Sequence, residues 1–186
     1  MDHYLDITLR PDPEFVPAHL MNALFAKLHR ALVSARCEDV GISFPQVHGK
    51  GLGLVLRLHG QQARLSDLMA KPWLAGMRDH VDVHTVQAVP ATGVGYRVVS
   101  RVQAKSSPAR ERRRLMRRQG LDTDQARQRI PDSSAECLSL PYVQLNSCST
   151  AQQFKLFIQH GPLRSTSTPG SFSAYGLSPQ ATVPWF

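Results

Sequence analysis

Two hydrophobic periods alternate in the first half of the chain, and this alternation limits the folds that it can adopt. Apolar residues recur at every second position over residues 4–9, as in a half-buried strand. Over residues 20–32 they recur instead at the three- and four-residue spacing of a helix. Pro17 can open this helix at its first position, and we expect the helix to run to about Arg36. The chain therefore begins with a strand that is followed by an amphipathic helix.

The next apolar stretches extend this order. The expected elements are a strand, a second strand with strict alternation, a short helix and a further strand, at residues 40–44, 52–58, 65–69 and 81–86. The order β-α-β-β-α-β is that of the ferredoxin-like fold, which RNA-recognition modules also use. Because a linker with Pro and Gly follows, we predict a ferredoxin-like domain at residues 1–92 and a second domain at residues 93–186.

The second half mixes both kinds of element around one arginine-rich helix. A strand is expected over residues 96–103, with Arg101 and Gln103 side by side on one face. Pro108 opens a helix that ends before Gly120, which provides the C-terminal cap. The remaining elements are a short helix and three strands, at residues 122–131, 142–145, 154–158 and 172–177. The predicted fold class is α+β in both halves.

The positive charge is concentrated at the start of this second half. The chain has 22 Lys plus Arg against 14 Asp plus Glu, and residues 97–130 hold eleven of the basic and three of the acidic side chains. The stretches on either side are neutral. Five arginines of the expected helix recur on one face: Arg110, Arg113, Arg114, Arg117 and Arg118. We favour nucleic-acid binding over an ordinary solvated face, because a dense arginine patch on an otherwise neutral protein suits a polyanion.

Other features exclude several function classes. No apolar run approaches the roughly 18 residues that a membrane helix needs, and the first ten residues are acidic where a secretory signal would be basic. The three cysteines are scattered, which fits free thiols in a cytoplasmic protein. His80 and His84 are four residues apart, but Val81 and Val83 between them alternate as in a strand, and no third ligand lies nearby. The glycine-bearing loop at 49–53 lacks the spacing of a phosphate-binding loop. We expect no membrane partner, metal or small-molecule cofactor.

Two of the singled-out features remain open at this level. Arg101 and Gln103 can read base edges, since arginine pairs with guanine and glutamine with adenine, but a solvent-facing pair of side chains fits equally well. His29 lies at the border of the apolar stripe of the first helix, where a lone histidine is more often a half-buried packing residue.

A series of patches along the chain matches a known family in order. They lie at residues 1–15, 100–106, 111–118, 129–132, 147–157, 160–163, 175–178 and 183–186. Together they resemble the subtype I-F CRISPR precursor-RNA endoribonucleases. The resemblance implies a metal-independent enzyme that cuts the repeat transcript at the 3′ base of its stem-loop, leaves a 2′,3′-cyclic phosphate and a 5′-hydroxyl, and then holds the hairpin. The implied partners are this CRISPR RNA hairpin and the backbone subunits of a type I-F surveillance complex.

The resemblance also implies roles for single residues. His29 is implied as the general base for the ribose 2′-hydroxyl, Ser147 as the residue that positions this nucleotide, and Tyr175 as the support of the histidine. Arg101 and Gln103 are implied to read the lowest guanine and the adjacent adenine of the stem. Arg114, Arg117 and Arg118 are implied to lie along its groove and phosphates. Phe154 is implied to stack on the terminal base pair, although its alternation with two apolar neighbours indicates a core position.

Two other functions stay compatible with the residues. One is a hairpin-binding subunit of the same fold whose catalysis is weak or lost. The other is a sequence-specific DNA-binding module, which would bind duplex DNA without depending on ribose hydroxyls.

Overall fold

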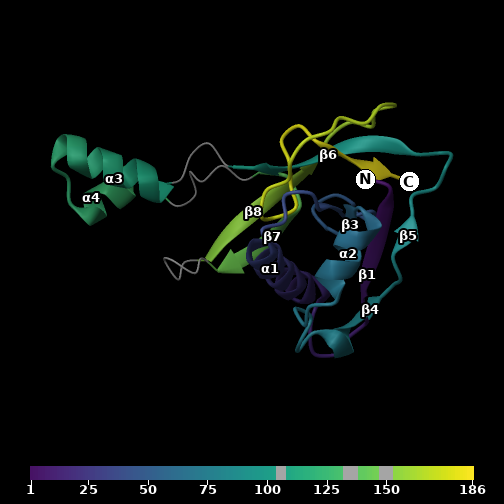
Figure 1. Cartoon of the computed structure of the whole chain (residues 1–186). Coiled ribbons are helices and arrows are strands. Elements are labelled where there is room, and N and C mark those ends of the chain that lie inside the picture. The colour runs from purple at the N-terminus through teal and green to yellow at the C-terminus, as the bar shows by residue number, and fades with distance from the viewer. Residues whose placement is uncertain (104–107, 132–137, 147–152) are drawn as a thin grey trace. The chain divides into compact units, whose positions relative to one another are not determined.

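The computed structural model describes residues 1–103, 108–131, 138–146 and 153–186 (Figure 1). By their internal contacts these residues form two compact units. The first unit combines Met1–Val102 with Leu140–Phe186, and the second is Gln103–Ser139. The first unit thus contains strands from both halves of the sequence, while the division into domains at 1–92 and 93–186 stays a prediction.

The first sheet of the larger unit has the strand order of a ferredoxin-like fold. Its strands are β1 (His3–Leu9), β2 (Gly41–Ser43), β3 (Val55–Gly60), β4 (Val81–Val83) and the short β5 (Gln87–Ala88). They pair in the order β2-β3-β1-β4, all antiparallel, and β5 also pairs with β1. The helices α1 (Pro17–Ala35) and α2 (Gln62–Met69) connect β1 to β2 and β3 to β4, and a short 3-10 helix, η1 (Arg78–His80), precedes β4. The predicted α+β class with its N-terminal β-α-β-β-α-β order is confirmed.

The second sheet of this unit is also antiparallel. Its strands are β6 (Gly95–Val102), β7 (Tyr142–Asn146), β8 (Gln153–His160) and β9 (Thr182–Trp185), in the order β7-β8-β6-β9. The prediction of a strand over residues 172–177 is wrong, because this stretch is irregular and turns at Gly176. The strand β9 was not predicted. It contains Pro184, which an edge strand such as β9 tolerates because one side of its backbone needs no ladder hydrogen bond.

The helix α1 supplies much of the core of this unit. Its apolar stripe is buried as the spacing predicts: Leu20, Met21, Leu24, Phe25, Leu28, Ala31 and Leu32. The helix contacts β1 of the first sheet and β7 of the second. The same apolar cluster includes Ile7 from β1 and Leu145 from β7. One border of α1, where His29 lies, therefore remains close to the second sheet without being part of the core.

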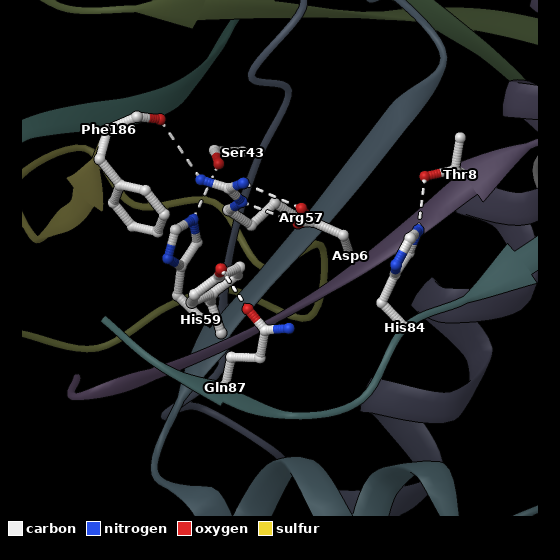
Figure 2. Close-up of polar contacts among 9 residues, drawn as sticks. Asp6, Thr8, Ser43, Arg57, His59, His84, Gln87 and Phe186 are labelled. Carbon is white, nitrogen blue, oxygen red and sulfur yellow. Dashed lines mark hydrogen bonds and ion pairs between the residues drawn. The ribbon is translucent and has the colours of Figure 1, made fainter. Parts of the chain in front are cut away.

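A polar cluster ties the end of the chain to the first sheet (Figure 2). The guanidinium of Arg57 donates to both carboxylate oxygens of Asp6, at 2.7 and 2.9 Å, and to the main-chain oxygen of Phe186 at 3.4 Å. Its charged carbon lies 4.5 Å from the ring centroid of Tyr4 and 4.3 Å from that of Phe186. Next to Arg57 on β3, His59 is fully buried and hydrogen-bonded to Ser43.

The second unit is built from the helices α3 (Pro108–Gln119) and α4 (Thr123–Arg129). Gly120 follows α3 with a φ of 63°, the left-handed conformation of the predicted C-terminal cap. Asp122 and Gln125 form a reciprocal capping box at the start of α4, as their spacing predicts. Arg112 donates to the carbonyl of Ile130 and links the two helices. Among the described residues, no helix has the length and hydropathy needed to cross a membrane.

Candidate active site

The imidazole of His29 is held at one border of α1 by a main-chain carbonyl. Its Nδ1 lies 2.8 Å from the oxygen of Ala174, a residue 145 positions along the chain. Because a carbonyl oxygen can only accept, Nδ1 carries the proton and donates this hydrogen bond. In the neutral ring the lone pair is then on Nε2. The half-buried His29 thus has one nitrogen fixed by the fold and the other able to accept a proton.

The ring of Tyr175 covers one face of His29. The two ring centroids are 4.1 Å apart and the ring planes differ by 13°. On the core side Tyr175 is also stacked with Phe25, one helical turn before His29, at 6.2 Å and 16°. Two consecutive residues therefore orient the imidazole. The carbonyl of Ala174 contacts it in the plane of the ring, and the ring of Tyr175 packs on its face.

Arg101 and Phe154 extend this cluster along the second sheet. Arg101 is exposed near the end of β6, and its guanidinium carbon lies 5.8 Å from the ring centroid of Tyr175 and 6.0 Å from that of Phe154. Phe154 is half-buried on β8 and packs against the core, as its alternation with the buried Leu156 and Ile158 indicates. The structure thus brings four of the predicted site residues together, from α1, β6, β8 and the irregular segment at 172–177.

The remaining predicted site residues are Ser147, Gln103 and five arginines. Ser147 is outside the described residues. Gln103 is exposed directly after β6, because the strand ends at Val102, one residue earlier than predicted. The five arginines of the predicted stripe are all exposed on α3 of the second unit: Arg110, Arg113, Arg114, Arg117 and Arg118. Their roles, and those of the clustered residues, stay predictions.

Two residues of the site were missed by sequence reasoning. Ala174 contributes only its carbonyl oxygen, and a main-chain group has no signature in a sequence. Gly176 closes the turn that carries Ala174 and Tyr175, with a φ of 70°. A glycine directly after a candidate site tyrosine is a signal for such a turn, but a weak one.

The two histidines that were considered as metal ligands have structural contacts. His80 is hydrogen-bonded to Asp12 at 2.9 Å and His84 to Thr8 at 3.2 Å. Within the described ranges, no three His, Cys, Asp or Glu side chains are grouped so that they could hold a metal ion. Burial raises the pKa of the Cys37 thiol, which leaves it protonated and a poor nucleophile.

The whole chain matches one family of known proteins. A family model described as CRISPR-associated protein (Cas_Csy4) matches residues 4–186. The chain belongs to the Cas_Csy4 family. Two relatives of this family, both named CRISPR-associated endonuclease Cas6/Csy4, are similar over 100% of both chains. The protein of Pseudomonas aeruginosa (strain UCBPP-PA14) is 54% identical over 188 residues, and that of Escherichia coli (strain UTI89 / UPEC) is 46% identical over 186.

Proposed function

We propose that this Cas_Csy4 protein is a metal-independent endoribonuclease that cleaves CRISPR repeat precursor RNA at the 3′ base of its stem-loop. The observation that carries the proposal is the 2.8 Å contact between Nδ1 of His29 and the carbonyl oxygen of Ala174, since this contact puts the lone pair of the neutral ring on Nε2. The names of its relatives, which are CRISPR-associated endonucleases, support the same class of reaction. The imidazole of histidine is the side chain that most often acts as a general base in enzymes.

In the proposed reaction the RNA supplies its own nucleophile. The 2′-hydroxyl upstream of the cut gives its proton to Nε2 of His29, and its oxygen forms a bond to the adjacent phosphorus. The bond from phosphorus to the 5′-oxygen of the next nucleotide breaks, and this oxygen leaves as a hydroxyl after it gains a proton. The products are a 2′,3′-cyclic phosphate and a 5′-hydroxyl. Ser147 would position the nucleotide, and Tyr175 keeps the imidazole in place through its stacked ring.

Recognition of the stem is assigned to the predicted RNA-binding residues. Arg101 and Gln103 would read the lowest guanine and the adjacent adenine of the stem, and Phe154 would stack on its terminal base pair. The exposed arginines of α3 would contact the phosphates along the stem. The protein would then keep the cleaved hairpin as a subunit of a type I-F surveillance complex in the cytoplasm.

The direct test is cleavage of the repeat RNA from the same host in the presence of EDTA. A matched RNA carries a single 2′-deoxy nucleotide just upstream of the expected cut. We expect only the all-ribose RNA to be cut, at the 3′ base of the stem, with a cyclic phosphate end. Tight binding of both RNAs without cleavage would instead identify a hairpin-holding subunit, and preference for duplex DNA would identify a DNA-binding module.

Removal of one arginine from α3 is expected to change the salt dependence of RNA binding. Arg117→Ala should weaken binding to all hairpins. The slope of log affinity against log salt is negative, and it should become shallower by about 0.7–0.9 if one phosphate contact is lost. Arg127→Ala, which removes an exposed arginine of α4, is the matched control and should keep the slope. Filter binding at several salt concentrations measures both, and an unchanged slope for Arg117→Ala would place this side chain away from the phosphates.

A further inference from the structure

We propose that Gly176 is a positioning residue for the reaction, because the turn that it closes carries both groups that orient His29. The inference rests on the proposed function, in which His29 is the general base. Through this turn, Gly176 would determine which nitrogen of the His29 ring is available to take the proton.

The turn brings two contacts to His29 from consecutive residues. The amide of Gly176 donates to the carbonyl of Ser173 at 2.8 Å, so Ala174 and Tyr175 are the two central residues of a closed four-residue turn. The amide of Ser173 also donates to the carbonyl of Leu177 at 2.8 Å. The carbonyl at Nδ1 and the ring against the imidazole face are therefore placed by one rigid element.

The fold fixes where this turn lies. The carbonyl of Gly176 accepts from the amide of Ile42 on β2 at 2.9 Å, and the amide of Ser178 donates to the carbonyl of Val99 on β6 at 3.0 Å. On the other side of the turn, the amide of Phe172 donates to the carbonyl of Glu38 at 2.8 Å. One strand of each sheet is thus hydrogen-bonded to this segment, while Ala174 and Tyr175 contact α1. A backbone shift of about 1 Å at Gly176 would disrupt its hydrogen bond with Ile42.

No other residue fits at Gly176 without such a shift. Its φ of 70° is in the left-handed region that side chains with a Cβ disfavour. A Cβ at this position would lie 2.6 Å from Cγ2 of Ile42, which is fully buried. Carbon atoms pack at 3.5–4.0 Å, so the turn and the side chain of Ile42 would have to separate by about 1 Å. Because Ile42 is close-packed in the core, we expect the turn to move. This displacement would pull the carbonyl of Ala174 and the ring of Tyr175 away from His29.

The test compares the wild type with two variants, each of which has a single glycine replaced by alanine. The first is the wild type and the second is Gly176→Ala. The third is Gly93→Ala, a matched control with the same kind of backbone, since Gly93 has a φ of 75° and nothing within 4 Å of an added Cβ. The measurements are the single-turnover rate of hairpin cleavage, the affinity for the 2′-deoxy hairpin, and the ring nitrogen signals of His29 in NMR spectra of the RNA-free protein.

We expect Gly176→Ala to slow cleavage by about 10²-fold, the loss that a misplacement of about 1 Å can cause, with hairpin affinity close to that of the wild type. The spectra should show the proton of His29 on Nδ1 in the wild type and in Gly93→Ala, and a mixture of tautomers in Gly176→Ala. A wild-type rate in Gly176→Ala would overturn the proposal, as would slower cleavage with the tautomer unchanged.

One further readout keeps the proposal testable if Gly176→Ala does not fold. The wild-type spectrum needs neither RNA nor a variant, and a proton on Nε2 there would by itself overturn the proposal. If the wild type does not cut the hairpin, the proposed function fails, which is a different result.

Discussion

His29→Ala is expected to abolish cleavage of the repeat hairpin and to leave its affinity for the hairpin nearly unchanged. The variant removes the nitrogen that would accept the 2′-hydroxyl proton, and a general base contributes typically 10²–10⁴-fold to such a step. The groups assigned to binding lie on other elements, with Arg101 on β6 and the arginines on α3. Single-turnover cleavage and filter binding with the same RNA measure the two effects separately.

Two variants control this result. His19→Ala removes an exposed histidine from the same helix, almost three turns before His29, and should keep both cleavage and binding. Arg101→Ala should weaken binding by about 1–3 kcal/mol through the lost guanine contact. If His29→Ala and Arg101→Ala lost hairpin affinity to the same extent, the separation of a catalytic from a recognition residue would be wrong.

The elements that local patterns specify were predicted closely. The helix α1 begins at Pro17 and ends at Ala35, one residue before the expected end, because a proline start and an apolar stripe both depend on neighbouring residues. The helix α3 ends at Gln119, before the glycine cap, for the same reason. The spacing of the five arginines likewise predicted exposed side chains on one helix.

The candidate site depends on contacts that no local pattern contains. Residues 172–177 have the aromatic and apolar composition of a strand, yet the hydrogen bonds of this stretch and of the following Ser178 go to separate points on β2, β6 and the segment before β2. Their irregular path brings a carbonyl to His29 from the far end of the chain. The border position of His29 predicted half-burial correctly, but the pattern could not distinguish a packing residue from one with a free Nε2.

A large loss of stability is expected between pH 7.5 and pH 5, because two buried histidines must stay neutral in the folded protein. Burial lowers the pKa of His59 to about 3, with a smaller effect of the positive Arg57. Burial lowers the pKa of His160 to about 4, and the nearby Arg97 acts in the same direction. In the unfolded chain both groups titrate near the ordinary value of 6.5. The unfolded state therefore binds more protons below pH 6.5, and acid favours it.

The contribution of the two neutral histidines to the free energy of unfolding is fully present above pH 6.5. It is lost as the pH falls toward 4, where His160 begins to take up its proton in the folded state. At pH 5 each histidine should lower the free energy of unfolding by about 2 kcal/mol, since each pKa unit corresponds to about 1.4 kcal/mol. Urea unfolding at pH 7.5 and pH 5 measures the loss. His59→Gln should remove about half of it, whereas His84→Gln, which removes an exposed imidazole next to the same sheet, should keep all of it. A loss in His59→Gln as large as in the wild type would show that protonation of this buried imidazole does not drive unfolding in acid.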